Sequence, residues 1–209
     1  SIRRRQRQMC IRDSSTTFPA SWPHGFTASI VFCDRYTAES FYFFLVNVTT
    51  LEVAGAAREL TRRVEGRLRD GKIGRLHVDN DLAYEGSDLT TWASETVASY
   101  TARVPHEADT NPVAERRLGT MKDALNATLA FGGAPKVLWP WAVSQYENVM
   151  YFINTRAHNP ATSPYKFSYP EAGTVDMSWA RPLFCDVTVH LAKQDRDGKV
   201  SHSGADGCY

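Results

Sequence analysis

The segment His77–Glu115 decides the fold that we expect for this chain. It opens with HVDNDLAYEG (residues 77–86) and closes with VPHEADTNPVAERR (residues 104–117). Asp79 follows a short apolar run, and Glu115 lies near the start of a long amphipathic segment, with thirty-five residues between the two acids. Their chemical meaning depends on whether the fold brings them together and whether a third acid joins them.

Composition is typical of an ordinary globular protein. The chain has 209 residues, of which 43% are hydrophobic and 22% are charged, and its formal net charge is +1. This charge gives no sign of a strongly basic surface, so any nucleic-acid surface must be a local patch. Three clusters of basic residues are candidates: Arg3–Arg7, Arg58–Arg69 and Arg116–Lys122.

The four cysteines indicate neither a zinc site nor a disulfide framework. They lie far apart in the sequence, without a C-x-x-C pair. We expect reduced thiols in an intracellular protein. No apolar run reaches the length of a membrane span, and no secretory signal opens the chain. Because the chain begins with Ser1, we expect a processed piece or a part of a longer product.

Hydrophobic periodicity predicts an alternating order of strands and helices. Three strands come first, followed by helix, strand, helix, strand and two helices. The longest predicted helix, 112–131, has an apolar stripe and ends at Gly132-Gly133. The predicted strands are 9–13, 26–34, 39–47, 73–79 and 99–105, and the predicted helices are 51–70, 87–98, 112–131 and one that starts at Trp139.

This order predicts a ribonuclease-H-like α/β fold, with a five-stranded mixed sheet and helices on both faces. The first three strands form an antiparallel meander, and the first strand lies centrally, next to the fourth. Asp13, Asp79 and Glu115 would then meet at one edge. We expect residues 1–158 to form this core and residues 159–209 to form a small C-terminal extension of short strands and loops, because helical periodicity vanishes after Asn159.

Three clustered carboxylates require a cation, because they cannot all stay ionised comfortably without one. Oxygen-only ligands suit Mg²⁺ or Mn²⁺. Two such ions, about 3.5–4 Å apart, catalyse in-line displacement at phosphorus. We therefore expect Asp13 to bridge two ions, with Asp79 and Glu115 each completing the ligand shell of one.

Several sequence blocks resemble, in the same order, blocks of the integrase catalytic core of copia-type LTR retrotransposons. That catalytic core is related to those of retroviral integrases. HVDNDLAYEG resembles the family's D-N-G-x-E-Y/F block, and PHEADTNPVAERR resembles its P-H-T-P-x-x-N-G-x-A/S-E-R block. Further similar blocks are IVFCDRYTAESFYFFL, LWPWAVSQYENVMYFINTRAH, SPYKFSY, RPLFCDVTVHL and DGKVSHSGADGCY. The resemblance covers nearly the whole chain.

The resemblance implies DNA 3′-end processing and strand transfer by Asp13, Asp79 and Glu115. It also implies double-stranded DNA as partner, a homo-oligomer, release from a polyprotein, and action in the nucleus after a cytoplasmic particle stage. We expect no membrane partner. The residues that we expect to contact DNA or order the site are Arg116, Lys122, Asn80, Asn111 and His106.

Some positions depart from the family pattern or permit another interpretation. Asp81 and Pro112 replace glycines of the family blocks, and Gly119 replaces a basic residue usually placed towards DNA. Such changes favour a divergent element or a decaying copy, so an inactive module that binds DNA or protein is the alternative function. A nuclease for RNA–DNA hybrids would need a fourth acid near the site.

Single residues also have structural interpretations. Asp34 is the rival for the first acid, although its place at a strand end favours a turn role. For His106 a hydrogen-bonded structural role is favoured over contact with the substrate, whereas Asn111 is equally consistent with a helix cap. The arginines of the first long helix have the pattern of a solvated face, and the aromatic residues from Trp139 to Phe152 that of core packing.

Overall fold

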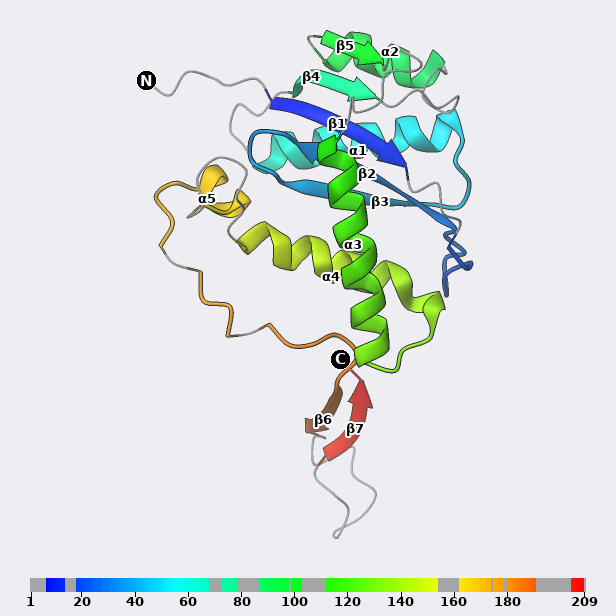
Figure 1. Cartoon of the computed structure of the whole chain (residues 1–209), viewed down its shortest axis with the longest axis vertical. Helices are drawn as coiled ribbons and strands as arrows, with labels where there is room; N and C mark the ends of the chain where they lie inside the picture. The colour runs from blue at the N-terminus through cyan, green and yellow to red at the C-terminus, as the bar shows by residue number, and fades with distance from the viewer. Residues whose placement is uncertain are drawn as a thin grey trace.

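The computed structural model of the chain shows a mixed sheet between two layers of helices (Figure 1). It describes residues 7–13, 18–67, 73–78, 87–97, 99–102, 112–153, 162–173, 175–178, 180–190 and 204–208. The strands are β1 (Arg7–Asp13), β2 (Ala28–Asp34), β3 (Ser40–Leu45), β4 (Ile73–Val78), β5 (Ser99–Ala102), β6 (Asp186–His190) and β7 (Gly204–Cys208). The helices are α1 (Thr50–Arg67), α2 (Ser87–Thr96), α3 (Pro112–Phe131), the 3₁₀ turn η2 (Lys136–Leu138), α4 (Trp139–Phe152) and α5 (Pro164–Ser168).

The main sheet has the strand order β3-β2-β1-β4-β5. β1 is antiparallel to β2, which is antiparallel to β3, and β1 is parallel to β4. The predicted five-stranded mixed sheet, the meander and the central place of the first strand are therefore confirmed. β1 begins at Arg7, two residues before the predicted start of the first strand.

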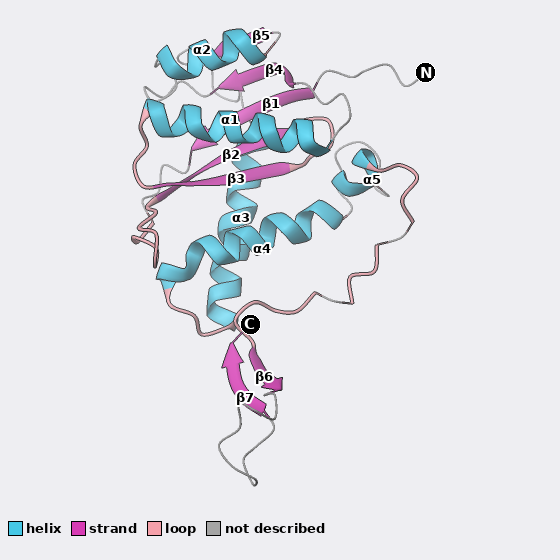
Figure 2. Ribbon diagram, turned by 180° about the vertical axis from the view of Figure 1, so that it is seen from behind, coloured by secondary structure: helices cyan, strands magenta, loops and turns pink. Residues whose placement is uncertain are grey.

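Each face of the sheet carries its own hydrophobic core because successive strand residues point to opposite faces. Met9 belongs to the core that α1 and α2 cover, and its neighbour Cys10 belongs to the core under α3 and α4. Figure 2 shows α1 in front of the sheet and α3 behind it, the reverse of Figure 1. Helices thus cover both faces, as the ribonuclease-H-like fold requires.

Helix α3 forms where its apolar stripe predicted it. The buried side chains recur at spacings of three and four residues, which places them on one helical face. Pro112 occupies the first position, where no backbone N–H is needed, and Gly133 ends the segment with a φ of +59°. The stripe packs against β1 and β2 and consists of Ala114, Leu118, Met121, Leu125 and Leu129.

Trp139 fixes the start of α4 to the segment between β1 and β2. Its side chain is buried, and its indole Nε1–H donates a hydrogen bond to the carbonyl oxygen of Pro19, at 3.1 Å. Phe18 stacks on the same ring with 4.3 Å between the ring centroids. Trp139 is therefore a core residue, as expected, whereas 38% of Trp141 is exposed.

The region after Asn159 contains one helix that the sequence analysis did not predict. α5 begins after Ser163, whose hydroxyl accepts a hydrogen bond from the backbone N–H of Lys166. Its Tyr165 contacts the rings of Tyr151 and Phe152 at the end of α4. Contacts between aromatic residues thus stabilise a helix too short to show a helical period.

The short strands expected in the C-terminal extension are present as β6 and β7, which pair with each other in a separate antiparallel sheet. The proposed boundary at 158/159 lies outside the described residues and stays a prediction. α1 ends at Arg67, and residues 68–70 of its predicted span also lie outside the described residues. None of the helices in the described part of the chain combines the length and apolar character needed to span a bilayer.

Candidate active site

Asp13 is the last residue of the central strand β1. Its backbone pairs with Ile30 of β2, while β4 runs along the other side of β1. Side-chain placement is described for β1 only at Met9 and Cys10, so the direction of the Asp13 carboxylate is not part of the described structure. The strand itself was predicted to end at this acid, and that prediction is confirmed.

Asp79 comes directly after Val78, the last residue of β4. Val78 lies opposite Ile11 in the parallel ladder, two residues before Asp13. Because the carboxyl ends of parallel strands meet at one edge of a sheet, the end of β4 at Val78 and the end of β1 at Asp13 lie at the same edge. Asp79 itself lies outside the described residues, as does its neighbour Asn80.

Glu115 is exposed in the first turn of α3. Its neighbour Ala114 is fully buried in the core that also contains Cys10, three residues before Asp13. The burial of Ala114 therefore holds the first turn of α3 against β1, and a carboxylate there interacts favourably with the helix dipole. Of the three predicted acids, Glu115 alone has a described side chain.

Asp34 is built into the turn between β2 and β3 rather than into the candidate site. Its carboxylate is fully buried and accepts hydrogen bonds from the backbone N–H of Tyr36, at 3.0 Å, and from the hydroxyl of Thr37, at 2.9 Å. It pairs with Met9, at the opposite end of β1 from Asp13. This geometry supports the turn role that the sequence favoured over that of first acid.

The candidate DNA-contacting residues are described in part. Arg116 is exposed and Lys122 half-buried on α3, while Asn111 and His106 lie outside the described residues. Gly119 is exposed on α3, and a Cβ there would meet nothing within 4 Å. The position where the resembled family places a basic residue is therefore open. The DNA contacts stay predictions.

Arg117 has an inward-facing role that the sequence analysis did not assign. It is half-buried and lines a small pocket of about 30 Å³ between α4 and the start of β3, together with Tyr42, Tyr146 and Glu147. Burial raises the pKa of Tyr146, and the adjacent Arg117 guanidinium partly offsets this. Spacing gave a signal: Arg117 follows Ala114 by three residues and precedes Met121 by four, on the flank of the buried stripe.

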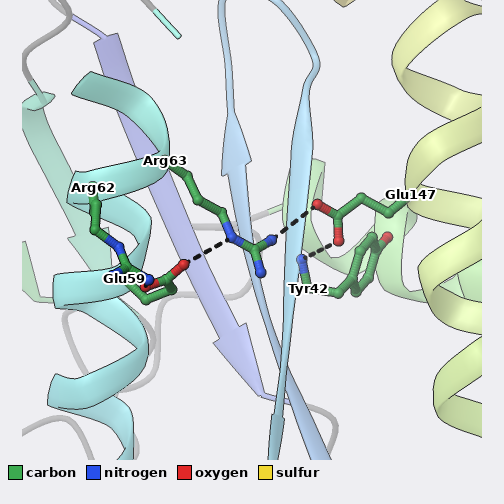
Figure 3. Close-up of polar contacts among 5 residues, drawn as sticks. All are labelled: Tyr42, Glu59, Arg62, Arg63 and Glu147. Atoms are coloured by element: carbon green, nitrogen blue, oxygen red, sulfur yellow. Dashed lines mark hydrogen bonds and ion pairs between the residues drawn. The ribbon is translucent and has the colours of Figure 1, made fainter. Parts of the chain in front are cut away.

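A second polar group missed by the sequence analysis crosses the edge strand β3 (Figure 3). Glu147 of α4 accepts a hydrogen bond from the backbone N–H of Tyr42 and pairs with Arg63 of α1, at 3.4 Å. Arg63 also pairs with Glu59 and lies 4.7 Å over the ring of Phe43. This group connects helices from the two opposite layers around the edge of the sheet.

Metal binding at this site depends on which side-chain oxygen, nitrogen and sulfur atoms lie close together. Within the described ranges, no group of three His, Cys, Asp or Glu side chains is placed to hold an ion. Asp79 and the carboxylate of Asp13 lie outside that search, so the triad stays a prediction. Carboxylate oxygens from three acids would be the ligand set that Mg²⁺ or Mn²⁺ prefers.

Comparison with known proteins identifies the fold. No family model and no curated protein matches the chain. The BIV integrase catalytic core is similar, with a TM-score of 0.56 and 18% identity over 78% of this chain and 93% of that one. The HTLV-2 integrase catalytic core in complex with magnesium (trimeric form) gives a TM-score of 0.59 and 12% identity over 78% and 95%.

A third structure covers more of the chain. The simian T-cell lymphotropic virus intasome in complex with PP2A regulatory subunit B56 gamma contains a chain with a TM-score of 0.62 and 12% identity. The similarity spans 95% of this chain and 67% of that one. These similarities establish a ribonuclease-H-like fold. More particularly, the architecture is that of retroviral integrase catalytic cores.

Proposed function

We propose that this chain is a divalent-metal-dependent polynucleotidyl transferase of the copia-type integrase class, which processes DNA 3′ ends and transfers them to a target strand. The observation that carries the proposal is the parallel pairing of β1 with β4. It brings the carboxyl ends of β1 and β4 to one edge of the sheet, and α3 packs on β1, so an Asp79 that follows β4 directly would lie near Asp13. The similarity in fold to integrase catalytic cores supports the same assignment.

Asp13, Asp79 and Glu115 would hold two Mg²⁺ or Mn²⁺ ions. Such ions lower the pKa of an attacking hydroxyl and neutralise charge on the leaving oxygen. The chain would position these ligands through its secondary structure: β1 and β4 would hold the two aspartates at the edge of the sheet, and the buried face of α3 would hold Glu115. Magnesium is present in the HTLV-2 structure of similar fold, which supports the choice of ion.

Double-stranded DNA is the proposed partner. Arg116 and Lys122 would contact backbone phosphates, which position DNA without reading its sequence. Asn80, Asn111 and His106 would order the site around the reacting strand. Because strand transfer joins two DNA ends to one target, the proposal includes a homo-oligomer. An intasome and a trimeric form among the similar structures support assembly. Action in the nucleus is also part of the proposal.

The alternative is an inactive module that binds DNA or protein. The open, uncharged position at Gly119 favours it, because a phosphate contact expected on that face is missing. The two proposals differ in metal dependence. An active enzyme requires the ions for turnover, whereas a binding module retains DNA affinity in a chelator.

The deciding experiment measures Mn²⁺ binding by calorimetry and strand transfer or nicking on a short duplex, with and without chelator. We expect Asp79→Asn, Asp13→Asn and Glu115→Gln each to lower activity by at least about 10²-fold, with the fold unchanged by circular dichroism. Asp34→Asn is the matched control and should keep metal-dependent activity. Residual activity in Asp79→Asn would show that the wrong carboxylate was chosen, and metal-independent DNA binding without turnover would favour the module.

A further inference from the structure

Two buried cysteines lie directly opposite each other across the β1–β2 ladder. Cys10 pairs with Cys33 in the antiparallel register, so both side chains point to the same face of the sheet. That face is the core under α3 and α4, in which both thiols are almost fully buried. Both are free in this structure.

The register places this pair within reach of a covalent bond. Opposite residues of an antiparallel ladder have Cα atoms about 4.5–5.5 Å apart, inside the range of about 4.4–6.8 Å found for disulfides. Their Cβ atoms, at about 4.5–5.5 Å, are slightly farther apart than the mean in disulfides. A bond here would therefore be strained, and strained disulfides are more easily reduced.

We propose that Cys10 and Cys33 form a redox-active pair that closes into a reversible intramolecular disulfide when the protein meets a two-electron thiol oxidant. The two sulfurs bond to each other as both S–H bonds break. The two electrons and two protons pass to the oxidant; with an azo compound such as diamide, its N=N bond is reduced to a hydrazine. A dithiol reductant reverses the step.

Burial keeps the pair reduced under ordinary conditions. It raises the pKa of Cys10 to about 11 and that of Cys33 to about 12, so little thiolate is present at neutral pH. Cys33 also lies 3.5 Å from the hydroxyl of Ser40. Closure therefore waits for a transient opening of the α3–α4 layer, and it is slower than oxidation of the partly exposed Cys185.

The consequence concerns the strand that carries Asp13. A Cys10–Cys33 bond would join β1 to β2 three residues before that acid and close the chain segment 10–33 into a loop. The pair lies outside the candidate triad, and its oxidation chemistry is independent of metal binding. The formation of this disulfide can therefore be tested without an assay of catalytic activity.

The test uses the full chain with Cys185→Ser and Cys208→Ser, so that only two thiols remain. The folded protein is treated with diamide, unfolded, alkylated and digested without reductant, and peptides are identified by mass spectrometry. We expect one cross-linked species joining the Cys10 and Cys33 peptides, lost on treatment with dithiothreitol. Free Cys10 and Cys33 should disappear together, at equal rates.

A register control moves one thiol along the same buried face. In Val31→Cys with Cys33→Val, the new thiol pairs with Arg12 rather than Cys10, and closure should be at least about 10-fold slower because diagonal neighbours are about 7–8 Å apart. Equal rates in both proteins would overturn the proposal. So would cross-linking that occurs only in urea, or dimers linked between chains. If the two-thiol variant does not fold, peptide mapping of the wild-type chain identifies the same bond.

Discussion

The carboxylate of Glu147 on α4 accepts a hydrogen bond from the backbone N–H of Tyr42 in the edge strand β3, with 3.1 Å between the two atoms. Figure 3 shows Arg63 reaching the same carboxylate from the opposite layer. An edge strand with unpaired N–H groups is a template for pairing with another chain. Glu147 therefore blocks one such group while linking α4 to the sheet.

Replacing Glu147 with Ala should lower the free energy of unfolding by about 1–3 kcal/mol, because the N–H of Tyr42 loses its acceptor. Glu147→Gln keeps an acceptor oxygen and should lose less. Urea unfolding followed by circular dichroism measures both. Arg63→Ala is the control for the ion pair, worth at most about 1 kcal/mol since 37% of the Arg63 side chain is exposed. An unchanged midpoint in Glu147→Ala would contradict the assigned role.

Replacing Asp34 with Ala should lower stability by about 2–3 kcal/mol, because the N–H of Tyr36 and the hydroxyl of Thr37 lose a charged acceptor. Thermal unfolding at neutral pH measures the loss. The stability of Asp34→Asn should lie between that of the unaltered protein and that of Asp34→Ala, since the amide oxygen of Asn still accepts one of these hydrogen bonds. If the folded Asp34→Asn protein lost Mn²⁺ binding, Asp34 would be the first acid in place of Asp13.

Gly119 is the simplest position at which to stabilise α3. An added Cβ meets no atom within 4 Å, so Gly119→Ala should raise the free energy of unfolding by about 1 kcal/mol through helix propensity alone. Gly55, in α1, has the same open surroundings and serves as the matched control, with the same gain expected. If Gly119→Ala lowered the stability while Gly55→Ala raised it, another part of the chain would have to pack against α3 at Gly119.

Gly132, just after α3, should respond in the opposite direction. A Cβ there would lie 2.6 Å from the Cβ of Phe184 and 3.2 Å from the carbonyl oxygen of Leu183. Phe184 has a positive φ of 62°, so its backbone has little freedom to move away. We expect Gly132→Ala to cost about 1–3 kcal/mol and to increase amide exchange around 180–185. Unchanged exchange there would show that the contact does not hold this segment on the core.

Stability should fall as the pH rises above about 9. The pKa of Cys10 is raised from 9.0 to about 11 and that of Cys33 from 9.0 to about 12, both chiefly by burial. The unfolded chain therefore releases these protons at lower pH than the folded chain does, and the stabilisation present below pH 9 is lost between about 9 and 12. Burial also raises the pKa of Tyr42 and Tyr146, which adds to the loss at higher pH.

Unfolding midpoints measured between pH 7 and pH 11 test this expectation. Cys33→Ala removes one of the raised groups, so its midpoint should fall less steeply with pH than that of the unaltered chain. A flat profile in the unaltered protein, or an equal slope in both, would show that the thiols are not buried as described.

The sequence by itself determined the order, the type and most of the boundaries of the elements in the core. Helix α3 was predicted at 112–131 and observed at Pro112–Phe131, because its stripe and the glycines that follow it are local signals. The parallel direction of β4 relative to β1 followed from the crossover through α1, because β1 and β3 both run antiparallel to β2. The place of β4 beside β1 followed from the ribonuclease-H-like fold that the order of elements predicts. The shared edge at which the carboxyl ends of β1 and β4 lie is a consequence of that order.

Tertiary structure alone decided which side chains meet across layers. The pairing of Cys10 with Cys33 depends on strand register, and the contact of Glu147 with Tyr42 depends on how α4 lies on the edge of the sheet. Neither has a local signal, because residues far apart in sequence are brought together by packing. α5 is stabilised in the same way, through contacts of Tyr165 with α4. Local sequence patterns thus determined the secondary structure, and non-local packing determined which side chains interact across the layers.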